Sequence, residues 1–209
     1  MEDDALFALG RAKFETLAGA SAPFSLVLIT IDTHVPGFVS KSCTSYAGSA
    51  NPILQAVHCT DQIVGDFVDF VHASAVAKHT VIALVSDHLR WGGIADHGLQ
   101  VPDDDRRLTF LLDVPGTTPR EVAAKGTEFD VGPTLAEALG VELTTPGRIG
   151  LGSSLLVGDG FLWTSASGLP SDFDAIYNFT RSDEVRAFVD AARIEAPDPG
   201  AARAQAKEN

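Results

Sequence analysis

The sequence predicts an α/β fold with three layers, α/β/α, built around a mostly parallel sheet. Three short apolar runs carry this prediction, at residues 24–31 (FSLVLITI), 80–85 and 108–114. Each run is nearly continuous in apolar residues instead of alternating, which is typical of strands buried on both faces. Long helical patterns lie between the runs, and strands that alternate with helices favour a parallel sheet covered on both sides.

The helices are predicted from apolar spacing and from signals at their ends. Residues 2–19 place leucine and phenylalanine among charged side chains, and residues 51–73 repeat apolar residues at three-and-four spacing. The segment 130–140 (DVGPTLAEALG) begins with Asp and Pro and ends with Gly, which are start and stop signals of a short helix. We expect a last helix at 182–194, capped by Ser182.

Composition excludes several classes of function. The chain has 209 residues, 45% of them hydrophobic, which is enough for one globular domain with a sizeable core. Its net charge of −13 opposes binding to nucleic-acid phosphates. No stretch approaches the roughly 20 apolar residues that span a bilayer, and the acidic first residues do not match a signal peptide. We therefore expect no nucleic-acid partner, no signal peptide and no transmembrane segment in this chain.

The two cysteines, Cys43 and Cys59, leave two interpretations open. They are too few and too far apart for a zinc knuckle. In an oxidising compartment they form one disulfide, and in a reducing compartment they are two buried thiols.

Polar side chains follow two of the predicted strands. The first strand ends in Asp32 and His34, and the second ends in Asp87 and His88. In parallel α/β sheets, ligands bind just beyond the carboxyl ends of the strands. Carboxylate and imidazole suit a borderline divalent ion such as zinc or manganese. Adjacent strand residues point to opposite faces, so Asp87 and His88 share one ion only if the chain turns there. A capping or loop role is the alternative for this pair.

Five segments, in this order and at this spacing, resemble the alkaline phosphatase and sulfatase superfamily. They are PFSLVLITIDTHVPGF, NPILQAVHCTDQIVGDFVDFV, TVIALVSDHL, FDVGPTLAEALG and RIGLGSSLL. The resemblance covers about residues 3–157 and is closest to the phosphoglycerol transferases, which are related to lipoteichoic acid synthases. It implies an alkaline phosphatase-like fold, present here as a partial domain. Residues 1–195 would be the C-terminal portion of a catalytic domain and 196–209 a flexible tail.

The resemblance also assigns roles to individual residues. Asp87 and His88 would hold one divalent cation, with manganese expected and magnesium or zinc as alternatives. His34 would contact the substrate phosphate. Members of the family transfer glycerol phosphate from phosphatidylglycerol to a glucan hydroxyl through a metal-bound threonine. That threonine and the first metal-binding acid have no match in this sequence. No catalytic nucleophile is therefore assigned, and the chain is expected to be inactive alone.

Further residues close to these positions in the sequence also have two interpretations. Arg90 and Trp91 either bind phosphate and sugar or pack their loop. Asp96 and His97 repeat the Asp-His dipeptide in a glycine-rich loop, where a loop role is favoured over a second metal site or a substrate contact. Asp32 either orients the imidazole of His34 or closes the turn at the strand end.

Three functions follow from these observations. The first is a phosphoglycerol transferase, acting on a phosphatidylglycerol-type lipid headgroup and a glucan acceptor at the periplasmic face of the inner membrane. The second is a sulfatase or phosphodiesterase that uses water as acceptor, and the third is a non-catalytic remnant or interaction module. In a periplasmic relative, a Cys43–Cys59 disulfide would brace the loop near the phosphate. An open sheet edge predicts self-association.

Overall fold

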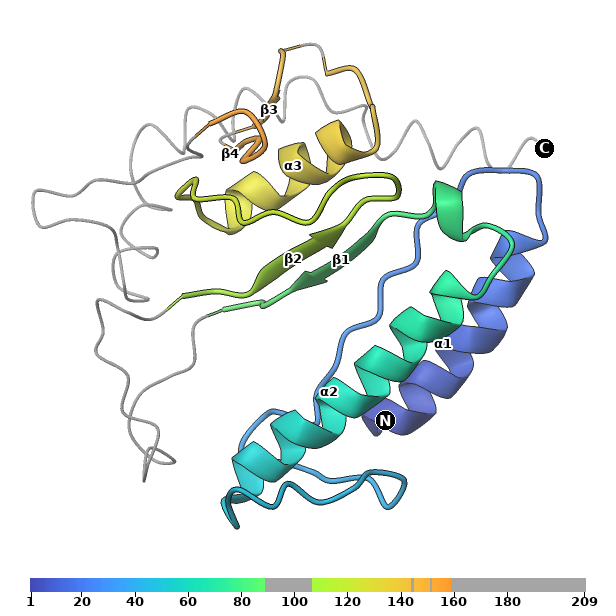
Figure 1. Ribbon diagram of the computed structural model, residues 1–209, viewed down its shortest axis with the longest axis vertical. Coiled ribbons are helices and arrows are strands. Elements are labelled where there is room, and N and C mark those ends of the chain that lie inside the picture. Colours follow the sequence, from blue (N-terminus) through green and yellow to red (C-terminus); the bar gives the residue numbers. More distant parts are fainter. Residues whose placement is uncertain (89–106, 144, 151, 159–209) are drawn as a thin grey trace, which may run out of the picture.

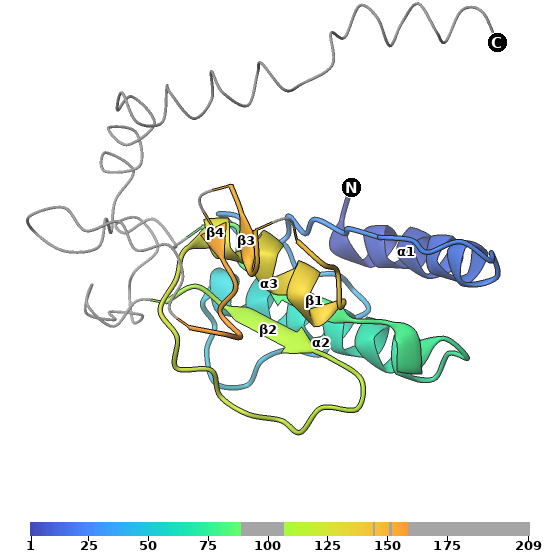
Figure 2. The ribbon, with the colours of Figure 1, turned by 90° about the horizontal axis from the view of Figure 1, so that it is seen from above.

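The structure, a computed structural model, describes residues 1–88, 107–143, 145–150 and 152–158. Over these residues it belongs to the α/β class. Figure 1 shows a pair of short strands, β1 and β2, between the helix pair α1 and α2 and a smaller unit of α3, β3 and β4. Figure 2 shows from above that α1 lies on the right, away from α3, whereas α3 and the strands overlap α2 in this view.

Helix α1 (Asp3–Ala18) confirms the amphipathic helix predicted at residues 2–19. Its buried positions are spaced by three and four residues and form one stripe along the helix: Asp3, Phe7, Gly10 and Phe14. Gly19 caps the C-terminus, and its amide donates to the carbonyl of Glu15. The stripe therefore sets which face of α1 packs against the rest of the chain.

Helix α2 (Pro52–His72) confirms the long helix predicted at 51–73. Asn51 caps it, because its Oδ1 accepts from the Ile53 amide at 2.9 Å, and Pro52 follows in the first turn. Phenylalanine rings join α2 to α1, with centroids 5.2 Å apart for Phe7 and Phe67. Ring contacts connect five members of this aromatic core: Phe7, Phe14, Phe24, Phe67 and Phe70.

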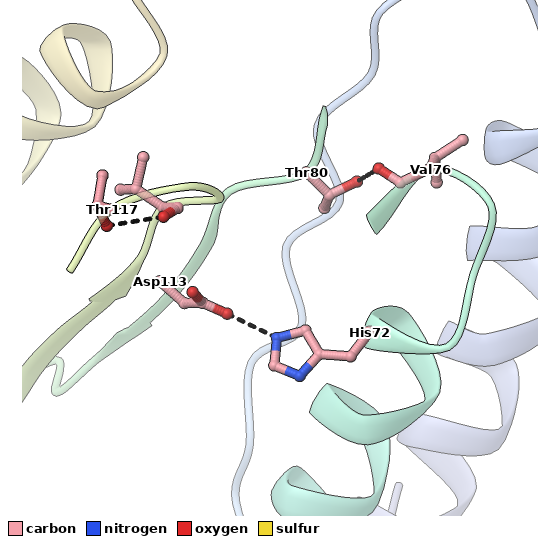
Figure 3. A network of polar contacts seen from close by, with 6 residues as sticks. His72, Val76, Thr80, Asp113 and Thr117 are labelled. Carbon is pink, nitrogen blue, oxygen red and sulfur yellow. Dashed lines mark hydrogen bonds and ion pairs between the residues drawn. The ribbon is translucent and has the colours of Figure 1, made fainter. Parts of the chain in front are cut away.

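Strands β1 (Ile82–Val85) and β2 (Phe110–Asp113) lie inside the second and third apolar runs. They pair antiparallel, with Leu84 opposite Leu111, so the predicted parallel pairing is wrong for these two strands. An apolar run reports burial of side chains and carries no information on strand direction. Before β1, a 3-10 turn, η1 (Ala77–His79), is closed by the Thr80 hydroxyl, which donates to the Val76 carbonyl at 2.9 Å (Figure 3).

The first apolar run, 24–31, is extended but is not a strand, which corrects the prediction of a strand buried on both faces. Its side chains alternate: Phe24, Leu26 and Leu28 lie on the half-buried side. Val27, Ile29 and Ile31 are 75%, 79% and 55% exposed. The half-buried side packs on α1, where Phe24 contacts Phe14. The other side is an exposed apolar face.

A third unit follows β2. The 3-10 turn η3 (Glu128–Asp130) leads into α3 (Val131–Ala138), which confirms the helix predicted at 130–140. After α3, the short strand β3 (Arg148–Ile149) pairs antiparallel with β4 (Gly152–Ser153). Asp130 is fully buried, and its Oδ1 accepts from the Ser153 amide at 2.8 Å. This carboxylate ties the β3–β4 hairpin to the start of α3.

The predicted helix at 182–194 and the predicted tail at 196–209 lie outside the described residues. Among the described helices, none has the length and apolar character needed to span a membrane.

Candidate functional site

The turn that carries His34 is anchored by a cluster of buried polar groups. Asp32 is 5% exposed, and its Oδ2 accepts from the Asp3 amide at 2.8 Å, so this carboxylate caps the first turn of α1. Asp3, fully buried, accepts from the Ile31 amide at 2.9 Å and from the Thr60 hydroxyl at 3.1 Å. The cluster therefore joins one side of the turn to both α1 and α2.

The backbone of His34 closes a tight turn. Its amide donates to the Ile31 carbonyl at 2.9 Å, and its carbonyl accepts from the Gly37 amide at 2.7 Å. The exposed imidazole has Nδ1 3.0 Å from the Val35 carbonyl oxygen. With Nδ1 as the donor there, Nε2 is the ring atom that can contact a ligand.

Asp32 and His34 share an open depression at the N-terminal end of α1. The residues that line it are Met1, Glu2, Ala5, Ile31, Asp32, His34, Pro36, Gly37 and Phe38. The contacts do not show Asp32 orienting the imidazole of His34: its carboxylate accepts from the Asp3 amide of α1, and its carbonyl accepts from the Phe38 amide at 2.8 Å. Asp32 therefore shapes the turn that presents His34, which is the strand-end role that the sequence left open.

The loop after His34 is fastened to the helices. Gly37 has φ +90, and a Cβ added there would lie 3.0 Å from the Pro52 carbonyl oxygen, so glycine is required by both conformation and contact. The buried Ser40 hydroxyl donates to Asp4 of α1. Of the two interpretations left open for the cysteines, the structure has the disulfide: Cys43 and Cys59 are bonded, with their Cα atoms 5.3 Å apart.

Asp87 and His88 follow β1 where the chain leaves the strand pair. The ladder continues to Ser86, whose amide donates to the Thr109 carbonyl at 2.9 Å. Asp87 Oδ1 then accepts from the His88 amide at 2.9 Å, and Asp87 Oδ2 lies 3.5 Å from His88 Nε2. The chain turns here, as one shared ion requires, and both side chains are solvent-exposed.

These two residues have the right donor types for a divalent transition-metal ion, but they are only part of a ligand set. Within the described residues, no group of three or more His, Cys, Asp or Glu side chains could hold an ion. Three or four protein ligands are usual for such ions. Asp87 and His88 do not line the depression beside His34. Four other predicted residues lie outside the described ranges: Arg90, Trp91, Asp96 and His97.

Sequence reasoning missed Asp3 and Thr60. An acid in the first turn of a helix is common, and nothing in the sequence signals that Asp3 contacts a hydroxyl 57 positions away. It also missed Gln55 and Gln62, which bind the loop that contains Cys43.

Comparison with protein families gives a match to the sulfatase family over residues 1–141. The chain belongs to the sulfatase family. The superfamily resemblance is thereby confirmed, and with it the relationship of the fold to the alkaline phosphatase-like α/β proteins.

Curated relatives of this sulfatase-family chain carry the name phosphoglycerol transferase I. The protein of that name from Salmonella newport is 31% identical over 197 residues, which cover 89% of this chain and 25% of the relative. Those from Salmonella paratyphi B and Salmonella typhimurium are 34% identical over 161 residues, covering 75% of this chain and 20% of each relative. The chain thus spans only 20–25% of these relatives. No solved structure matches it.

Proposed function

We propose that this chain is part of a phosphoglycerol transferase of the sulfatase family. In this proposal His34 contacts the substrate phosphate, and Asp87 and His88 hold one divalent cation, with manganese expected. The observation that carries it is the position of Asp87 and His88 at a turn directly after β1, in a chain related to phosphoglycerol transferase I. The donor would be a phosphatidylglycerol-type headgroup and the acceptor a glucan hydroxyl.

The proposed reaction is the exchange of one phosphate ester for another. The bond between phosphorus and the diacylglycerol oxygen breaks, and a bond between phosphorus and the glucan oxygen forms. The acceptor hydroxyl loses its proton, and the departing diacylglycerol oxygen gains one. A bound cation would offset negative charge on the phosphoryl oxygens. Protein groups that donate to those oxygens stabilise the same charge.

The residues of this chain would bind and orient the phosphate. His34 would donate from Nε2 to a phosphoryl oxygen when its imidazole is protonated, since Nδ1 is directed to the Val35 carbonyl. Asp32 holds the turn by capping α1. In this proposal Asp32 does not contact the phosphate. Arg90 and Trp91 remain predicted contacts for phosphate and sugar.

A non-catalytic interaction module is the second candidate. It is favoured by one observation: in the described part of the chain, Asp87 and His88 have no third ligand grouped with them. A nucleophile and a first metal-binding acid are also missing from the motifs of this sequence. A complete site would then need a third ligand from outside the described residues and a nucleophile that the motifs of this sequence do not provide.

Three further features belong to the proposal. A complete domain would have three α/β/α layers with a mostly parallel sheet, to which residues 1–195 contribute, followed by the tail at 196–209. The site would face the periplasm, and the Cys43–Cys59 disulfide supports this because such bonds persist in oxidising compartments. The exposed face of residues 24–31 supports self-association.

Manganese binding to the purified chain tests the proposed metal ligands. Free Mn²⁺ is followed by electron paramagnetic resonance during titration of wild type, Asp87→Asn, His88→Ala and the control His79→Ala. We expect weak binding by wild type and by the control, and loss of that binding in the other two variants. Equal binding by all four proteins would remove Asp87 and His88 from the site.

Release of glycerol phosphate from a phosphatidylglycerol analogue tests the reaction. We expect no turnover by the chain alone with Mn²⁺. We expect turnover after addition of the part of a Salmonella relative that this chain does not cover. Turnover by the chain alone, abolished in His88→Ala, would mean that it contains its own nucleophile. Turnover to water in the presence of glucan would identify a hydrolase instead.

A further inference from the structure

Two glutamines of α2 hold the loop that follows the His34 turn. The Oε1 atom of Gln62 accepts from the Thr44 amide at 3.1 Å and from the Thr44 hydroxyl at 2.7 Å. Its Nε2 donates back to the Thr44 carbonyl at 3.1 Å and to the His58 carbonyl of α2 at 3.2 Å. One carboxamide thus pairs with both backbone groups of a single loop residue, as a neighbouring strand would.

Gln55 repeats this arrangement two residues further along the loop. Its Oε1 accepts from the Tyr46 amide at 2.9 Å, and its Nε2 donates to the carbonyls of Tyr46 at 2.6 Å and Ser49 at 2.5 Å. The ring of Tyr46 also lies against the imidazole of His58, with centroids 5.4 Å apart. Both glutamines are half-buried, whereas their bonds to Thr44 and Tyr46 lie at the exposed surface of the loop.

The glutamines flank the disulfide on one face of α2. Gln55, Cys59 and Gln62 are spaced by four and three residues, which places them on the same side of the helix. On the loop, Cys43 immediately precedes Thr44. The loop is therefore held at Cys43, Thr44 and Tyr46, and only the first of these attachments depends on redox state.

We propose that Gln55 and Gln62 are positioning residues, which keep the loop at 43–49, and through it the His34 turn, docked on α2 whether Cys43 and Cys59 are oxidised or reduced. The consequence for activity rests on the proposed function, because it takes His34 as the phosphate contact. The docking of the loop on α2 does not depend on the proposed function.

Amide hydrogen exchange at single residues tests the docking. In the oxidised protein, Gln62→Met should speed exchange of the Thr44 amide about tenfold and leave the Tyr46 amide unchanged, and Gln55→Met should do the converse. Methionine keeps the length and helix propensity of glutamine without its hydrogen bonds. The matched control is Val57→Met, at an exposed position of α2.

Reduction separates the glutamines from the disulfide. After reduction, wild type should keep the protection of both amides to within about threefold, and the double variant Gln55→Met, Gln62→Met should lose about tenfold at each amide. Loss of protection in reduced wild type, with the core amides of α1 still protected, would overturn the proposal. So would unchanged protection in the reduced double variant. If the reduced protein unfolds, docking in the reduced state is overturned, and the single variants in the oxidised protein then decide only whether the glutamines hold the oxidised loop.

A second glutamine variant gives a signature that a general structural role would not produce. In Gln62→Glu the carboxylate accepts from Thr44 but cannot donate to its carbonyl, whereas the protonated acid can do both. Protection of the Thr44 amide relative to wild type should therefore recover as the pH falls through about 4.3, the ordinary value for glutamate. No recovery in a folded protein would count against paired donation and acceptance at this position.

The link to His34 has its own measurement. The imidazole signals of His34 are followed by NMR during titration with sn-glycerol 1-phosphate. Reduced wild type should bind as oxidised wild type does, and the reduced double variant should bind about tenfold more weakly. If no protein binds, the proposed role of His34 fails, and the exchange data still decide whether the glutamines hold the loop. Equal binding by the reduced double variant, despite a released loop, would overturn the link.

Discussion

His72 Nε2 lies 2.6 Å from Asp113 Oδ2 and joins the last turn of α2 to the end of β2 (Figure 3). A cationic histidine at a helix C-terminus also interacts favourably with the helix dipole. The pair connects the helix pair to the strand pair. Both side chains are half exposed, at 50% and 52%, so water and salt weaken their interaction.

Asp113→Asn should lower the free energy of unfolding by less than about 1 kcal/mol, because exposed ion pairs contribute little. Urea titration followed by circular dichroism measures the change, with Asp69→Asn as control, at an exposed acid of α2. Repeating the titration in 1 M NaCl should shrink the difference, since salt screens exposed charges. A loss that is large and insensitive to salt would mean that Asp113 acts through packing instead.

Asp130 should be far more sensitive to substitution than Asp113. The buried carboxylate accepts from the Thr127 amide at 2.7 Å and from the Ser153 amide at 2.8 Å. In Asp130→Asn one of these amides faces an NH₂ group and loses its acceptor, which should cost about 2 to 3 kcal/mol. The exposed Glu128→Gln, two residues earlier, is the control and should change stability by less than about 0.5 kcal/mol. Equal effects of the two substitutions in urea titrations would contradict this account.

Two glycines should respond to alanine in opposite directions. Gly37 has a positive φ and close contacts with α2, so Gly37→Ala should destabilise the protein by about 1 to 3 kcal/mol. Gly65 lies inside α2 with nothing within 4 Å of an added Cβ, so Gly65→Ala should stabilise it by about 1 kcal/mol. Thermal melting of both variants beside wild type checks the pair. A tolerated Gly37→Ala would mean that the His34 loop is not held against α2 in solution.

Sequence reasoning located the helices and the two paired strands well because their signals are local. Apolar spacing and end signals placed α1 and α2 within a residue or two of their observed ends. The predictions of parallel pairing for β2 and of a strand at residues 24–31 were wrong for one reason. An apolar run shows that a segment favours burial, and it does not say which neighbour covers it.

The candidate site was predictable only where its chemistry is contiguous in sequence. The Asp87 and His88 pair and its turn follow from the dipeptide at the end of a strand and the change of composition after it. The bond between Asp3 and Thr60 joins residues that are distant in sequence, and single-sequence patterns carry no record of such partners. The same holds for Gln55 and Gln62, which look like ordinary polar residues on a helix.

The exposed apolar face of residues 24–31 should make the isolated chain self-associate. Among the described residues, no backbone group of 24–30 makes a hydrogen bond, and the segment has no charged residue to discourage pairing with another chain. Ile29 is 79% exposed at the centre of that face. Light scattering coupled to size exclusion should therefore show wild type as a mixture that shifts to larger species with concentration. Ile29→Lys should shift it towards monomer without changing helix content, whereas Leu9→Lys, at an exposed position on α1, should not. A wild type that stays monomeric at all concentrations would mean that this face is covered by the chain itself.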